Sequence, residues 1–134
     1  MDFFSPRDKY GKGSLSPVFS QEPVKVISKR VDTIMREHHF IKADVIKADV
    51  EGFEYYAFKG AEQFLKSDTA PDIIFEFVDW AEQRAMNLTP GASQRLLLEM
   101  GYQLYTLEKN SIVKLQNVIE SGAADLIASK NVKY

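Results

Sequence analysis

Apolar and polar residues are grouped in blocks along the chain, and the blocks predict a succession of strands and helices. Apolar runs rich in Val, Ile, Phe and Tyr predict strands at residues 24–28, 43–51, 71–80, 102–107 and 124–129. The run "ADVIKADVE" at 43–51 has the composition of a strand buried on both faces, as in a parallel sheet. Segments with apolar residues at three- and four-residue spacing predict helices at 31–40, 52–67, 88–102 and 111–121.

The helix at 88–102 has the clearest end signals. Thr89 suits the N-cap, Pro90 the first helical position and Gly101 the position just after the helix. Strands that alternate with helices of this length predict an α/β fold with a mainly parallel sheet. The 134 residues fit one domain, in which residues 1–23 are an irregular segment and residues 24–134 form the folded part.

Composition narrows the classes of function. The net charge of −2 makes nucleic acid a poor ligand, and the lack of cysteine excludes disulfides and zinc–thiolate sites. His38 and His39 are adjacent and would point about 100° apart on a helix, so we predict no metal site. No apolar run is long enough to span a membrane and the start lacks a signal-peptide layout, so we expect a cytoplasmic protein with no membrane contact.

Acidic residues gather where the predicted strands end. Asp49 and Glu51 close the strand at 43–51, and Glu76 and Asp79 lie towards the end of the next. Ligands of open α/β sheets bind beyond the carboxyl ends of the strands, so neighbouring strands would line one cleft with carboxylates. An acid at a helix start is also favoured by the helix dipole, by about 0.3–1 kcal/mol, so Glu51 or Glu54 could serve stability alone.

The stretch "VIKADVEGFEYYAFKGAEQFL" resembles a motif of FkbM-type S-adenosylmethionine-dependent methyltransferases, with Lys-Ile-Asp-Val-Glu-Gly, then Glu, then Lys-Gly-Ala. Pro71 and Glu76 match the next strand, Gly101-Tyr102 matches the following helix end, and "SKRVDTIM" resembles a segment in which Asp32 is the first acid. The resemblance spans roughly residues 10–130. The matching motif residues are Lys47, Asp49, Val50, Glu51, Gly52, Glu54, Lys59, Gly60 and Ala61.

The resemblance implies the C-terminal half of a Rossmann-like methyltransferase sheet, truncated, with its last strand antiparallel. It implies S-adenosylmethionine as cofactor and a hydroxyl of a sugar or small metabolite as acceptor. Asp49, Glu51 and Glu76 are the candidate catalytic residues, because a carboxylate can accept the proton of the acceptor. The candidate substrate-binding residues are Lys47, Glu54, Asp79 and Trp80, and the candidate cofactor-binding residues are Asp32 and Asp49.

The family's glycine-rich cofactor turn has no counterpart in this sequence. Gly11 and Gly13 lack a preceding buried strand, so we interpret them as loop. Without the family's first strand, the strand at 43–51 becomes an edge, which we expect a homodimer contact or the N-terminal segment to cover. One alternative is therefore a non-catalytic module used for self-association or partner binding; a weaker one is a hydrolase using Glu51 and Glu76.

Overall fold

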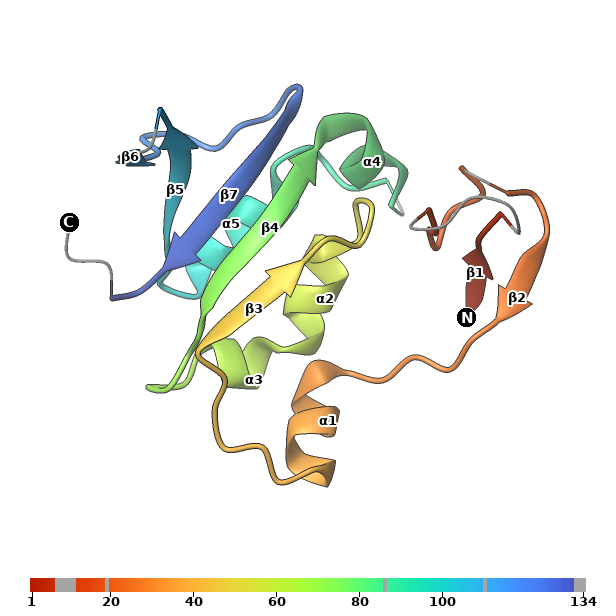
Figure 1. Ribbon diagram of the computed structural model, residues 1–134, viewed down its shortest axis with the longest axis horizontal. Helices are drawn as coiled ribbons and strands as arrows, with labels where there is room; N and C mark the ends of the chain where they lie inside the picture. The colour runs from red at the N-terminus through yellow and green to blue at the C-terminus, as the bar shows by residue number, and fades with distance from the viewer. Residues whose placement is uncertain (7–11, 19, 86, 110, 132–134) are drawn as a thin grey trace.

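The computed structural model describes residues 1–6, 12–18, 20–85, 87–109 and 111–131. They form a five-stranded mixed sheet with helices on one face, and a separate two-stranded hairpin at the N-terminus (Figure 1). In the hairpin, β1 (Asp2–Phe4) pairs antiparallel with β2 (Pro23–Lys25). The segment 1–23, expected to be irregular, thus contributes one strand, and Phe4 also bridges to Ser14.

The main sheet has the strand order β3-β4-β7-β5-β6, from β3 (Val45–Ala48) through β4 (Asp72–Val78), β7 (Ala123–Ser129) and β5 (Gln103–Glu108) to β6 (Ser111–Lys114). Only β3 and β4 pair in parallel, and the other three pairings are antiparallel. The expectation of a mainly parallel sheet was therefore wrong, while the antiparallel last strand is confirmed. The reason is that β7 returns between β4 and β5 and separates two strands that run in the same direction.

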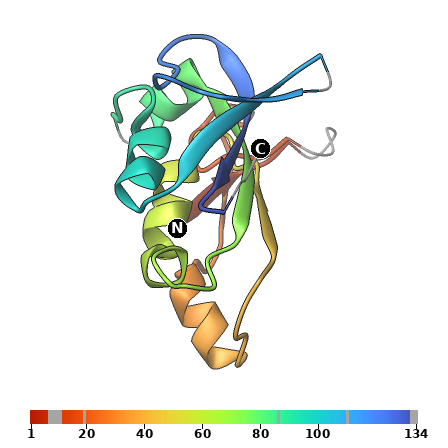
Figure 2. The same ribbon diagram turned by 90° about the vertical axis from the view of Figure 1, so that its left-hand side faces the viewer.

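Helices cover one face of this sheet (Figure 2). They are α1 (Val31–Glu37), α2 (Glu54–Gly60), α3 (Glu62–Leu65), α4 (Asp79–Arg84) and α5 (Ala92–Glu99). Ile73, Phe75 and Phe77 of β4 turn to the helices and are almost fully buried, and the Phe58 ring of α2 meets Phe75 edge-on at 5.4 Å between centroids. Burying such side chains contributes about 1.5–3 kcal/mol each, which fixes the helices against the sheet.

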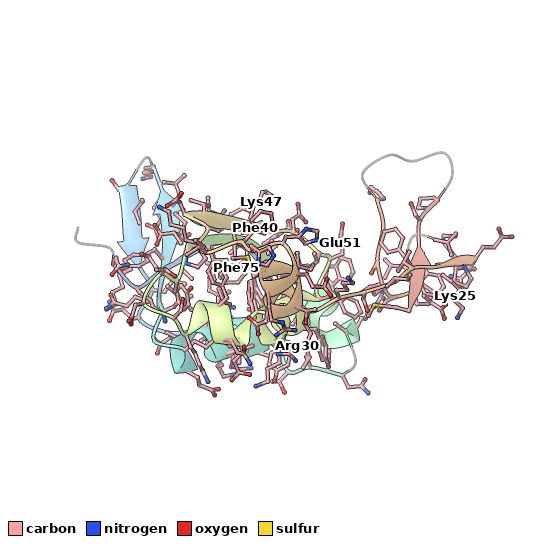
Figure 3. All side chains as sticks on the ribbon, turned by 90° about the horizontal axis from the view of Figure 1, so that it is seen from below. Lys25, Arg30, Phe40, Lys47, Glu51 and Phe75 are labelled. Atoms are coloured by element: carbon pink, nitrogen blue, oxygen red, sulfur yellow. The ribbon has the colours of Figure 1, made fainter. Side chains whose placement is uncertain are left out.

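None of the described helices lies on the opposite face of the sheet, so the strand at 43–51 is not buried on both faces as predicted. Val45 is 56 % exposed, and Lys47 lies beside Ile74, which is 41 % exposed, on the side away from the helices (Figure 3). Strand β3 is also shorter than predicted and stands at the sheet edge, which confirms the edge position that the sequence implied.

Other boundaries differ for local reasons. The helix predicted at 111–121 is strand β6, because Lys109 has a φ of 44° and turns the chain back into a hairpin with β5. The helix predicted at 88–102 begins only at Ala92, with Gly91 rather than Thr89 as N-cap, whereas Gly101 takes the expected left-handed conformation with a φ of 90°. The predicted helix at 52–67 is divided into α2 and α3, and α4 was not predicted.

Candidate functional site

The turn from β3 into α2 is the local structure that presents the candidate residues. Glu51 and Gly52 both have positive φ, 54° and 94°, so the chain reverses sharply just after the strand. A Cβ on Gly52 would overlap the carbonyl group of Ala81 and lie 2.7 Å from the Glu82 nitrogen, so only glycine fits there. The turn therefore holds the end of β3 directly against the start of α4, which follows β4.

Four carboxylates from three strands meet beside this turn on the helix-free face. Asp49 and Glu51 follow β3, Glu76 lies on β4, and Asp125 of β7 is the register partner of Glu76. We call Asp49, Glu51, Glu76 and Asp125 the acidic rim. Partial burial raises the pKa of Glu76, and the negative charges of Asp49, Glu51 and Asp125 raise this pKa further, while Lys47 opposes the shift. Glu76 is therefore the acid of the rim that most readily accepts and holds a proton.

Lys47 forms an ion pair with one member of the acidic rim, Asp49. Its Nζ lies 3.0 Å from Oδ2 of Asp49, and both side chains are largely exposed. Strand alternation places residues 47 and 49 on the same face, so a ligand at the rim would meet one cation as well as the acids. The structure thereby brings together four of the predicted residues: Lys47, Asp49, Glu51 and Glu76.

An aromatic and cationic patch adjoins the rim. Trp80 is 45 % exposed, and the Arg84 guanidinium carbon lies 5.4 Å from its ring centre. These two residues line a crevice together with Glu51 and with Ser14 and Ser16 of the N-terminal loop, and the crevice is too narrow to admit a water molecule. The exposed ring face of Trp80 is the kind of surface that packs against apolar groups, and its substrate-binding role stays a prediction.

The N-terminal loop at residues 12–18 closes the other side of the rim. Asp49 and Val50 line a hollow of about 460 Å³ with Phe3, Gly13 and Ser14. A second hollow, of about 390 Å³, lies between Val50, the start of α1 and the apolar side chains Phe53 and Tyr56. The space beyond β3 is therefore partly enclosed and large enough to admit a small ligand.

Three of the predicted site residues, Glu54, Asp32 and Asp79, accept hydrogen bonds from main-chain N–H groups. The Glu54 carboxylate is 4 % exposed and accepts the Val50 N–H at 2.8 Å, which stabilises the β3–α2 turn. Asp32 accepts the N–H groups of Gln63 and Phe64 at 3.1 and 3.0 Å and so caps α3. Both are structural contacts, and they leave the substrate role of Glu54 and the cofactor role of Asp32 without geometric support.

Asp79 is also held by the main chain. Its carboxylate accepts the N–H of Trp80 at 2.6 Å and that of Gly122 at 2.8 Å, which ties the end of β4 to the loop before β7. It positions Trp80 and is close to the site, although its oxygens are largely engaged.

Burial raises the pKa of Glu54 to about 6, from an ordinary value of 4.5. Its hydrogen bonds from the main chain oppose this shift, and the nearby charge of Glu82 adds to it. Glu82 is 2 % exposed and accepts the N–H groups of Gly91, Ala92 and Ser93 at 2.5, 3.2 and 2.7 Å. These bonds explain why α5 begins without the predicted Thr89 cap: a carboxylate from α4 caps it.

Asp125 and Arg84 are the site residues that the sequence did not reveal. Asp125 joins the rim because β7 inserts next to β4, a placement that its local sequence does not encode. Arg84 lies on α4, which the apolar pattern did not predict, although Asp79 followed by "WAEQR" is a possible helix start.

Neither a metal site nor a membrane-spanning helix is present among the described residues. No group of three or more His, Asp or Glu side chains there could hold a metal ion. None of the helices in that part of the chain is long and apolar enough to cross a membrane.

Ligands of open α/β sheets bind beyond the carboxyl ends of the strands, and the acidic rim lies near those ends of the parallel strands β3 and β4. Comparison with protein families matches residues 2–104 to the Methyltransferase FkbM domain. The chain belongs to this family. Comparisons with curated proteins and with solved structures find no match.

The family implies S-adenosylmethionine as methyl donor, but the described residues do not form a complete site for it. Gly13 packs against the Phe3 ring, which fills the space that a Cβ there would occupy, so its loop does not cradle a ligand with open backbone. Asp32, a candidate cofactor-binding residue, already accepts two main-chain N–H groups. The described residues therefore fit the acceptor side of a methyl-transfer site better than the cofactor side.

Proposed function

We propose that this chain supplies the acceptor side of an S-adenosylmethionine-dependent methyl-transfer site, acting on a hydroxyl group of a sugar or small metabolite. The observation that carries the proposal is the acidic rim, together with membership of the FkbM family. The strand arrangement supports it: β3, β4 and β5 run in one direction and β7 opposes them, as in one half of a Rossmann-like methyltransferase sheet.

Each part of the rim has a chemical task in this proposal. Glu76, whose pKa is raised, accepts the proton of the acceptor hydroxyl, and Asp49 or Glu51 holds a neighbouring hydroxyl by hydrogen bonding. Trp80 packs against the apolar face of the acceptor, and Lys47 neutralises part of the charge that builds up beside Asp49. The remainder of the cofactor site would come from outside the described residues.

The test is a transfer assay with methyl-labelled S-adenosylmethionine and a panel of sugars and polyols. We expect label on an acceptor oxygen, with the rate reduced about 10²–10⁴-fold in Glu76→Gln and Asp49→Asn. Asp68→Asn, a change of the same kind at an exposed position away from the rim, should leave the rate unchanged. Label that reaches no acceptor, with no heat of binding when the chain is titrated with millimolar S-adenosylmethionine, would contradict the proposal.

The second candidate function is a non-catalytic module for self-association. The observation that favours it is the edge strand β3, which pairs with β4 on one side and with no strand of the described chain on the other. An inactive chain that still associates through this edge would support the second function over the first.

A further inference from the structure

The free side of β3 presents main-chain groups ready for another strand. The Asp72 N–H donates to the Asp44 carbonyl at 3.1 Å, and Val45 is the register partner of Asp72. Main-chain groups of alternate residues point to opposite sides of a strand, so Ile46 and Ala48 pair with β4, whereas Val45, Lys47 and Asp49 point outwards. The edge is open along β3, where Val45 is 56 % exposed, and the N-terminal loop lies across a hollow from Asp49 and Val50 at its end.

The sequence of this edge is complementary to itself. Residues 46–50 read "IKADV". If two such segments lie antiparallel with Ala48 opposite Ala48, then Ile46 faces Val50 and Lys47 faces Asp49, in both directions. A two-fold axis perpendicular to the sheet keeps each face on its own side, so the charged pairs share the helix-free face and the apolar pairs share the other.

We propose that a second copy of this chain binds at the β3 edge in this register and joins the two sheets into one. The outward N–H and C=O groups of Lys47 and Asp49 would bond reciprocally with those of Asp49 and Lys47 of the partner subunit. The Lys47 side chain, now 3.0 Å from Asp49 of its own chain, would also reach Asp49 of the partner subunit.

Neighbouring symmetric registers lack this match. Pairing centred on Lys47 would place two lysines opposite each other, and pairing centred on Ile46 would place Val45 opposite Lys47. Charges of the same sign directly opposite each other destabilise an antiparallel pair, whereas opposite charges stabilise it. Charge complementarity therefore selects the register centred on Ala48, and it selects a second copy of this chain as the occupant. The interface rests on the second candidate function, self-association, and it shares Lys47 and Asp49 with the proposed acceptor site, but its formation does not require methyl transfer.

The chain also contains a matched control. Residues 41–45 have the same sequence, "IKADV", and Lys42 and Asp44 form the same kind of ion pair, at 3.1 Å. This first copy lies almost wholly before β3, so its charges take no part in the register centred on Ala48.

The test is sedimentation of the intact chain at several concentrations, which gives the association constant. The wild-type chain is compared with variants in which the charge at one or two positions is reversed. We expect a species of twice the 15.3 kDa monomer mass. Lys47→Asp and Asp49→Lys each place like charges opposite each other twice, and should weaken association about tenfold or more. The double variant restores opposite charges and should recover the original constant, while Lys42→Asp, which changes the net charge equally, should not alter it.

Amide hydrogen exchange locates the interface independently of the variants. The N–H groups of Lys47 and Asp49 should exchange more slowly as the concentration rises through the association range. A chain that stays monomeric at its highest soluble concentration would overturn the proposal. So would a dimer in which these two amides exchange freely, or one that Lys42→Asp weakens as much as Lys47→Asp.

Discussion

Two groups of carboxylates lie near the ends of β3 and β4, and their surroundings differ sharply. Glu54 and Glu82 are buried, and their oxygens accept main-chain N–H groups at the turn after β3 and at the start of α5. The acids of the rim lie on the helix-free face, where Glu76 is surrounded by other negative charges rather than by N–H donors. Both groups lie near the strand ends. They differ in their hydrogen-bond partners: the buried acids accept main-chain N–H groups, and Glu76 of the rim faces other carboxylates.

The comparison teaches how a structural acid differs from a candidate functional one. A buried carboxylate that accepts several N–H groups stabilises the fold, because losing it leaves those donors buried and unsatisfied. A partly exposed carboxylate among like charges costs stability, and such an arrangement is expected where a ligand or proton is to be bound. Removing the oxygens that accept N–H groups in the first group should therefore lower stability, whereas removing a charge from the rim should not.

The largest effect on stability is expected for Glu82→Ala. It removes the acceptor of three N–H groups at the start of α5, so the free energy of unfolding should fall by about 3 kcal/mol. Urea unfolding measures the change. Gln83→Ala, at an exposed position of the same helix, should change it by less than about 0.5 kcal/mol. A loss in Glu82→Ala no larger than that control would remove the distinction between the two groups.

A smaller and pH-dependent effect is expected for Glu54→Gln. Folding raises the pKa of Glu54 from 4.5 to about 6, so the protonated carboxyl is the form that the fold favours. The wild-type chain retains the full stability of this position below pH 4.5 and loses about 2 kcal/mol of it as the pH rises through about 6. The glutamine variant stays neutral and keeps an oxygen for the Val50 N–H, so it should equal the wild type in acid and exceed it at pH 7.

Urea titrations at a series of pH values test this, with the difference between variant and wild type as the quantity of interest. A difference that does not change with pH would mean that the Glu54 carboxylate is as well solvated in the folded chain as in the unfolded one.

The smallest effect on stability is expected for Glu76→Gln. Removing one charge from the rim relieves repulsion from Asp49, Glu51 and Asp125, so unfolding should shift by less than about 0.5 kcal/mol, towards greater stability. The same variant should lose methyl transfer. A marked loss of stability measured by thermal or urea unfolding would place Glu76 with the structural acids instead.

The sequence located the site residues at the ends of β3 and β4 well, but it predicted the order and direction of the strands in the sheet poorly. The motif around Asp49 located the β3–α2 turn and three of the four predicted residues that the structure brings together, because a strand, a glycine turn and a helix are adjacent in sequence. Asp125 could not be found in this way, since it reaches the rim only through the insertion of β7 between β4 and β5. The sequence allowed a stabilising role for Glu54 but not its partner, and it gave no sign of the role of Asp32, because only the folded turn and α3 bring the N–H groups to these carboxylates.

The repeated pentapeptide before the turn also bears on how the chain finds its alignment with β4. A slip of five residues would offer β4 the same Ile, Lys, Ala, Asp and Val in the same order, with Phe40 in place of Val45. The edge strand itself therefore discriminates weakly between the two alignments. The native one is fixed from outside the repeat, by the length of chain from α1 and by Gly52, whose close approach to Ala81 admits no shift.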